Sequence, residues 1–95
     1  MNKNLRYRLA SKIAKDTKHE IDKSEEQDGP FHSLLEGLTV LREQYFKLEQ
    51  EIFGNAPKNT DTVRLEAIQV AAVATRIAMM VSPVPDIPNR HKIFP

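Results

Sequence analysis

The most continuous apolar stretch of the chain runs from Thr62 to Val81, and hydrophobic residues lie on nearly every side of the helix that it would form. Such a stretch must be buried, so we expect it to form the central helix of the fold. Its few polar residues recur at spacings of four, three and seven, and they therefore share one stripe of the helix. If the chain carries chemistry, this stripe is where we expect it. The residues of the stripe are Thr62, Glu66, Gln69 and Arg76.

Residues 4–24 show the pattern of an amphipathic helix. Leucine, isoleucine and alanine recur at helical spacing, while lysine and arginine fill the other faces. Gly29 and Pro30 follow in SEEQDGP, and they are expected to stop the helix and turn the chain. The apolar positions are Leu5, Leu9, Ala10, Ile13, Ala14 and Ile21.

A second helix is expected to begin after Ser33. Ser33 and Glu36 have the spacing of a capping box, in which each side chain accepts a hydrogen bond from the backbone amide of the other residue. Phe31, just before this cap, is expected to pack near Gly37 or Leu38. Glycine inside a helix costs about 1 kcal/mol relative to alanine, so Gly37 predicts a close neighbour or a ligand at its backbone. The apolar seam of this helix steps by four and three through Leu34, Leu38, Leu41, Tyr45, Leu48 and Ile52.

Residues 54–61 have the composition of a turn. Gly54 suits the end of the second helix, and Thr60 or Asp61 suits the N-cap of the third. Beyond Ser82 the chain has four prolines and cannot continue as a helix. Its apolar residues predict an extended strap that packs on the bundle or on a partner subunit.

The predicted fold is all-α, with three principal helices in one domain over residues 1–81 and a proline-rich tail over residues 82–95. A chain of 95 residues buries a modest fraction of its surface. Two other helices hardly cover an apolar central helix. We therefore expect a homodimer in which a second copy completes the bundle, since each further buried Leu or Ile contributes about 1.5–3 kcal/mol.

Composition narrows the function classes. The absence of cysteine excludes disulfides and thiolate chemistry and is compatible with a cytoplasmic location. The apolar run over residues 67–81 is too short and too interrupted for a membrane span. Residues 1–23 carry seven Lys or Arg and three Asp or Glu, whereas residues 24–53 carry two and seven, which favours helices with complementary surfaces. Nucleic-acid binding by the basic segment is a weaker hypothesis, because stacking aromatic residues are scarce there.

Carboxylates on two helices that face each other favour a divalent cation site completed by a phosphate-bearing substrate. Glu36 and Glu43 lie seven residues apart on one face of the second helix, and Glu66 lies on the third. Structural roles compete, because Glu36 suits the capping box and Glu43 with Lys47 forms an i, i+4 pair of opposite charge. Arg76 requires an acidic or phosphate partner, either a carboxylate of the second helix or a nucleotide.

Two pieces of the chain, DGPFHSLLEGLTVLREQ and RLEAIQVAAVATRI, resemble the MazG-like group of all-α nucleoside triphosphate pyrophosphohydrolases, in particular its short bacterial and phage forms. The resemblance covers roughly residues 15–81, and EAIQVAA is its most specific part. It implies a helical dimer or tetramer that hydrolyses nucleoside triphosphates to monophosphate and pyrophosphate. It also implies that Mg²⁺ is held by an EExxE motif on one helix and an ExxD-type motif on a later one.

The metal motifs are incomplete in this chain. Glu43 and Glu66 match motif acids and are the metal ligands that the resemblance implies, with Glu36 as an alternative third carboxylate. Other acidic positions hold neutral or basic residues, and a protonated lysine has no lone pair and repels a metal ion. These replacements are Gln44, Lys47 and Gln69. The residues expected to contact a nucleotide are Arg76, Gln69, Gln44 and Lys47.

Two function hypotheses follow. The first is a MazG-like protein with a degenerate site that binds nucleotide or retains weak Mg²⁺-dependent pyrophosphohydrolase activity. The alternative is a noncatalytic, phage-encoded helical dimer. It would act as a protein-interaction module and bind another protein through its tail. Lys47 in place of an acid favours the alternative. The sequence leaves open whether the chain is an enzyme, and Mg²⁺ is the cofactor only if the site is functional.

Overall fold

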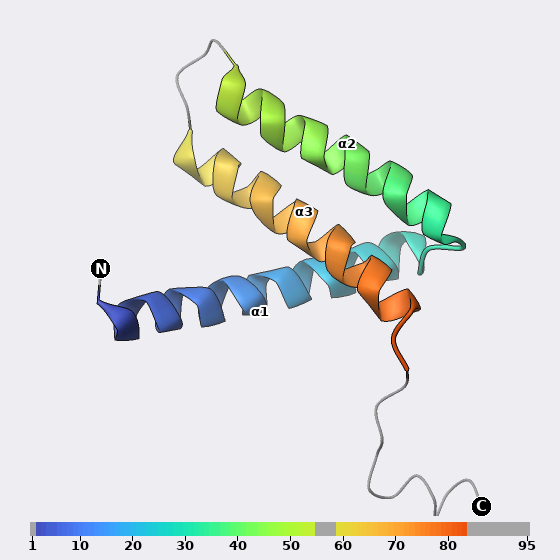
Figure 1. Ribbon diagram of the computed structural model, residues 1–95, viewed down its shortest axis with the longest axis horizontal. Helices are drawn as coiled ribbons and strands as arrows, with labels where there is room; N and C mark the ends of the chain where they lie inside the picture. Colours follow the sequence, from blue (N-terminus) through green and yellow to red (C-terminus); the bar gives the residue numbers. More distant parts are fainter. Residues whose placement is uncertain (1, 55–58, 84–95) are drawn as a thin grey trace, which may run out of the picture.

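The part of the chain that the structure describes forms three helices. The computed structural model describes residues 2–54 and 59–83. No strand occurs within these ranges, which confirms the predicted all-α fold with three principal helices. Residues 84–95, most of the predicted strap, lie outside the described residues. Helix α1 spans Lys3–Asp28, α2 spans Leu34–Phe53 and α3 spans Thr60–Met80 (Figure 1).

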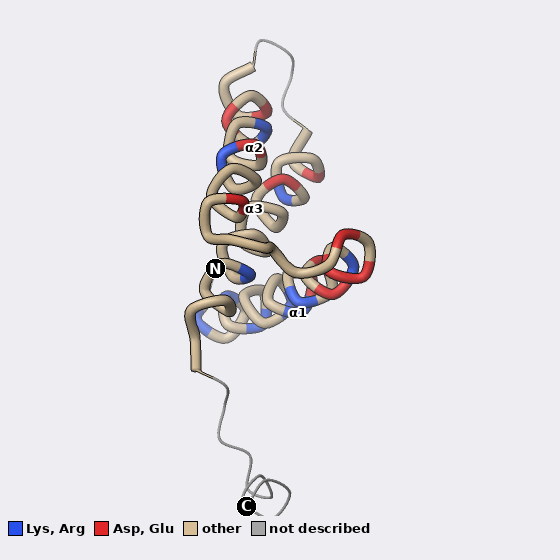
Figure 2. The backbone as a smooth tube through the Cα atoms, turned by 90° about the vertical axis from the view of Figure 1, so that its right-hand side faces the viewer, with Lys and Arg blue, Asp and Glu red and all other residues tan. Residues whose placement is uncertain are grey.

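Helix α3 is central because it packs against both other helices, whereas the described residues of α1 and α2 do not approach each other closely. Helices α2 and α3 lie side by side as an antiparallel hairpin, and α1 crosses α3 obliquely (Figures 1 and 2). The first half of α1 extends beyond the edge of the hairpin. This arrangement confirms the prediction of an apolar central helix. The buried apolar side chains are Ile21, Ile68, Ala72 and Val73.

The cover around α3 is incomplete within one chain. The apolar central helix was expected to need more cover than two other helices provide. In the structure Ala67, Ala74 and Ala78 are exposed along one edge of α3. Two neighbouring helices leave this edge open, because each of them covers only part of the circumference of a third.

Helix α1 ends at Asp28, later than the predicted end near residue 24. The intervening residues are mostly Glu and Gln, which are good helix formers, so the helix continues until glycine interrupts it. Gly29 adopts a positive φ of 74° and its amide donates a hydrogen bond to the carbonyl of Glu25 at 2.9 Å. The additional turn brings Glu25 into the structured part of the fold.

One of the two hydrogen bonds of the capping box predicted at the start of α2 is present. Ser33 Oγ accepts a hydrogen bond from the amide of Glu36 at 3.0 Å. The Glu36 carboxylate was expected to return to the amide of Ser33. It instead accepts from the amide of His32 at 3.3 Å and lies 3.1 Å from the His32 Nδ1. At His32 the Glu36 carboxylate contacts both the backbone amide and the imidazole, whereas at Ser33 it could contact only the backbone amide.

The N-cap of α3 is Asn59, so the expectation of Thr60 or Asp61 is wrong by one or two residues. Asn59 Oδ1 accepts hydrogen bonds from the amide of Asp61 at 2.9 Å and the amide of Thr62 at 3.3 Å. Asparagine satisfies two free amides at once, which explains why the helix begins one or two residues earlier than expected.

Gly37 sets the face of α2 that packs on α3. A Cβ at Gly37 would lie 2.8 Å from Ile77 Cγ1 and 3.1 Å from Phe31 Cδ2, which confirms the predicted close neighbour and the packing of Phe31. Because the closest approach is at glycine, α2 is rotated away from the predicted seam. The positions facing α3 are Gly37, Leu41, Gln44 and Leu48, whereas Leu34, Leu38 and Tyr45 of the seam are exposed.

Candidate functional site

Arg76 is a buried cation, with only 6% of the residue exposed. Its Nη2 donates a hydrogen bond to the carbonyl of Gly29 at 3.0 Å, and its guanidinium lies 3.8 Å over the ring centroid of Phe31. Its Nε lies 3.6 Å from Glu25 Oε2 and makes no hydrogen bond. The side chain therefore ties α3 to the end of α1 and to the α1–α2 connection.

The acidic partner of Arg76 differs from the sequence-based expectation. A carboxylate of α2 was favoured, but the partner is Glu25 of α1. The late end of α1 and the oblique crossing of α1 over α3 bring Glu25 to the guanidinium. These contacts account for Arg76 without a phosphate, while its expected contact with a nucleotide stays a prediction.

The predicted motif residues of α2 lie mainly on its surface. Glu36, Glu43 and Lys47 are exposed, and Gln44 is partly buried on the side that faces α3. In the part of the chain that the structure describes, Glu43 and Lys47 form no ion pair, so their expected i, i+4 contact is absent. Glu36 is already engaged by His32.

Glu66 is the predicted metal ligand in the least satisfied environment. It is partly buried on α3, and its Oε2 is buried without a hydrogen-bond partner. Gly37 of α2 lies against Ile77 of α3. Because the two helices are antiparallel and rise equally per residue, Glu66, eleven residues before Ile77, lies near the level of Leu48, eleven residues after Gly37. A carboxylate oxygen in such surroundings is costly unless a donor or a cation reaches it.

A single chain does not gather these acids into a complete metal site. Within residues 2–54 and 59–83, no group of three or more His, Asp or Glu side chains could hold a metal ion. A site built on Glu43 and Glu66 would have to draw its other ligands from water, substrate or a second chain. Gln69 is partly buried and belongs to the same polar stripe of α3 as Glu66.

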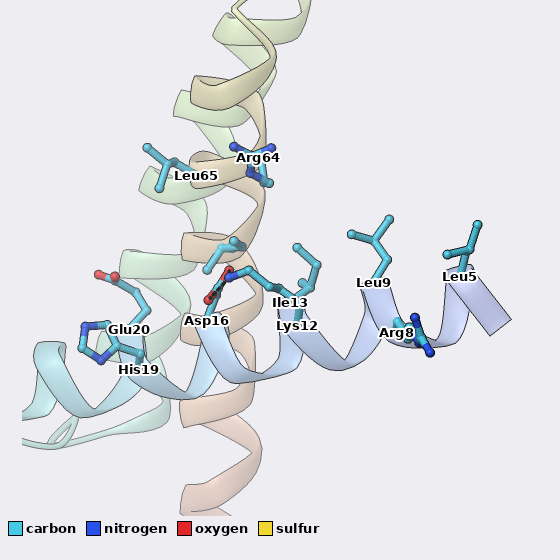
Figure 3. Close-up of a pocket in the computed structure, with 11 residues that line it drawn as sticks. Leu5, Arg8, Leu9, Lys12, Ile13, Asp16, His19, Glu20, Arg64 and Leu65 are labelled. Atoms are coloured by element: carbon cyan, nitrogen blue, oxygen red, sulfur yellow. Dashed lines mark hydrogen bonds and ion pairs between the residues drawn. The ribbon is translucent and has the colours of Figure 1, made fainter. Parts of the chain in front are cut away.

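An open groove of about 800 Å³ lies between α1, from Leu5 to Glu20, and the start of α3 (Figure 3). Its apolar side chains include Leu5 and Leu9, which are half exposed on the stretch of α1 that runs past α3. Charged residues of both signs surround them, with Lys12 and Asp16 joined in an ion pair at 3.1 Å. Sequence patterns did not reveal this groove, because it depends on how α1 crosses α3.

A second groove of about 530 Å³ lies between α2 and α3. It opens onto a set of large apolar side chains on one side of α2, which we call the α2 stripe. Their exposed fractions range from 39% to 79%. Leu35, Phe46 and Phe53 were not singled out in the sequence, although apolar residues outside the predicted seam were the available signal. The α2 stripe consists of Leu34, Leu35, Leu38, Tyr45, Phe46 and Phe53.

Comparison with known proteins adds no family assignment: neither the protein-family models nor the curated proteins nor the solved structures give a match. The similarity to the MazG-like group therefore stays a prediction from the residues that carry it. Across residues 2–54 and 59–83, none of the helices has the length and apolar character needed to cross a membrane.

Proposed function

We propose that this chain is a noncatalytic helical interaction module that works as a homodimer and buries the α2 stripe against a second copy. The observation that carries the proposal is the exposure of six large apolar side chains on one side of α2. Several large apolar side chains exposed along one side of a helix are more typical of an interface than of a free helix.

The small interior of one chain supports the same proposal. Within the described residues, four apolar residues are buried, and two of them are Ala72 and Val73, which have small side chains. Each large side chain that moves from water into an interface contributes about 1.5–3 kcal/mol. A second copy would therefore supply apolar burial that three helices alone lack.

The proposed dimer predicts that single lysines in the α2 stripe separate the subunits. Wild-type protein should sediment as a dimer, whereas Leu38→Lys and Phe46→Lys should raise the dimer Kd at least ~100-fold, since each change acts twice per dimer. Gln27→Lys is the matched control, because Gln27 is exposed on α1, away from the α2 stripe. Sedimentation equilibrium measures all four proteins. A monomeric wild type, or variants as tightly dimeric as the control, would contradict the proposal.

A second candidate function is metal-dependent nucleotide binding by a MazG-like protein with a degenerate site. The specific observation in its favour is the buried Glu66 Oε2 that lacks a partner, since a divalent cation would satisfy it. In this proposal Glu43 and Glu66 hold Mg²⁺, with Glu36 as the alternative third ligand. The residues that would contact the nucleotide are Arg76, Gln69, Gln44 and Lys47.

Isothermal titration with Mg²⁺ and Mn²⁺, alone and with non-hydrolysable nucleoside triphosphates, tests this second candidate. Metal-dependent nucleotide binding that Glu66→Gln abolishes would support it. Glu26→Gln is the control, because Glu26 is an exposed acid on α1. Restoring the motif acids with Gln44→Glu, Lys47→Glu and Gln69→Asp should increase Mg²⁺-dependent hydrolysis. Absence of both binding and restored hydrolysis would leave the interaction role alone.

A further inference from the structure

Two opposite charges, Arg42 and Glu49, line the same groove as the centre of the α2 stripe. They are seven residues apart, which corresponds to ~10 Å along the helix axis, so they cannot pair with each other. Neither takes part in an ion pair within the residues that the structure describes. One charge of each sign beside an apolar surface indicates a partner that presents the opposite charges at the same spacing.

A second α2 helix that runs in the opposite direction presents the opposite charges at this seven-residue spacing. The midpoint between Arg42 and Glu49 falls between Tyr45 and Phe46. A two-fold axis at this midpoint lays a second α2 antiparallel on the first, and Arg42 of each copy then faces Glu49 of the other. We infer that the two copies of the proposed homodimer pair through α2 in this antiparallel register. The inference rests on the proposed dimer and adds the orientation of the partner and the residues that select it.

The apolar residues fit the same register. Tyr45 and Phe46 of the two copies meet around the axis, and Leu38 of one copy faces Phe53 of the other. The α3 side of the groove is formed by Val70 and Ala74, whose short side chains let the partner helix come close. The antiparallel pair thus buries most of the α2 stripe.

The charges also disfavour the parallel alternative. In a parallel two-fold pair each residue lies beside its own copy, so Arg42 would face Arg42 and Glu49 would face Glu49. Two like-charge contacts oppose that arrangement, whereas the antiparallel register has two attractive contacts. The α2 surface therefore selects both its partner and the direction of the partner helix.

This pairing forms a closed dimer, because a two-fold contact uses the same surface on both copies. The α1 grooves lie outside the paired α2 surfaces, so the dimer would present two identical grooves to other molecules. Glu43 and Lys47 also stay outside the contact, since they lie on α2 away from the groove residues.

Charge reversal at the two positions tests the register. Arg42→Glu alone or Glu49→Arg alone creates two like-charge contacts per dimer, and each should raise the dimer Kd about tenfold at low ionic strength. The double variant Arg42→Glu/Glu49→Arg should return the Kd to within about threefold of wild type, because the partners have exchanged places. An equimolar mixture of the two single variants should form a heterodimer that is tighter than either variant alone.

Matched controls are Lys15→Glu and Glu26→Arg, which change the net charge equally at exposed positions of α1 and should leave the Kd unchanged. Circular dichroism of each variant shows whether the helices persist. Either single variant compared with the double variant tests the register, so one poorly folded single variant does not leave it untested. The antiparallel register is wrong if the wild type is a dimer and the single charge reversals do not change its Kd. It is also wrong if the double variant binds no more tightly than the single variants. Either result contradicts the register but not the dimer. A monomeric wild type overturns the proposed dimer itself.

Discussion

At the scale of single residues, Gly37 determines how closely α2 and α3 approach. A Cβ there would lie 2.8 Å from Ile77 Cγ1, so the Ile77 side chain or the helix that carries it would have to shift. Gly37→Ala should lower the free energy of unfolding by about 1 kcal/mol, because overpacking outweighs the gain in helix propensity. Urea denaturation measures the change. In an Ile77→Ala background the cost should shrink or change sign, and an equal cost in both backgrounds would contradict the close approach.

Arg76 illustrates a different single-residue effect, the burial of a charge with partial compensation. Arg76→Met should destabilise the fold by about 2 kcal/mol, because it removes the hydrogen bond to the Gly29 carbonyl and the stacking on Phe31. Glu25→Gln should cost less than about 1 kcal/mol, since the Glu25 side chain is 29% exposed and its contact is 3.6 Å long. Denaturant titration of both variants distinguishes the two contributions. A larger loss for Glu25→Gln would show that the ion pair dominates.

At the scale of the elements, α2 is a helix with two apolar sides. One side meets α3 through Gly37, and the other is the α2 stripe. Periodicity in the sequence showed that α2 is an amphipathic helix, but a four-three repeat does not state which neighbour covers which residues. The predicted seam mixed residues of both sides: Leu41 and Leu48 face α3, whereas Leu38 and Tyr45 are exposed.

The start of α3 gives a prediction at the same scale. Asn59→Ala removes an acceptor for two backbone amides and should destabilise the protein by about 1 kcal/mol. Asn59→Asp keeps the acceptor and should retain most of the stability. Thermal unfolding followed by circular dichroism compares the two variants. If Asn59→Asp were as destabilised as Asn59→Ala, the cap would not explain the start of the helix.

At the scale of the whole molecule, a homodimer couples stability to concentration. Because association stabilises the folded state by mass action, the Tm should rise by about 4 °C for each tenfold increase in protein concentration. Phe46→Lys should abolish this dependence by keeping the chain monomeric. Scanning calorimetry over a concentration series checks both. A high Tm that does not vary with concentration would show that one chain suffices for a stable fold.

Local patterns in the sequence were enough to predict the number and kind of elements. Apolar spacing gave three helices, Gly29 with Pro30 gave the first break, and Ser33 gave the start of α2. These signals are local, because helix propagation and capping depend on residues within one or two turns. The need of Arg76 for an acidic or phosphate partner could also be stated from sequence, since a cation inside an apolar helix must be compensated.

Which helix surfaces meet could not be predicted from these local patterns, because it depends on how the helices pack in three dimensions. The crossing of α1 over α3 selected Glu25 as the partner of Arg76, and the approach at Gly37 turned the α2 stripe outward. Both outcomes depend on crossing angles and interhelical distances, which packing across long sequence separations sets. Glu43 and Glu66, for example, lie on different helices, so the distance between them is fixed by that packing and not by their spacing in the sequence.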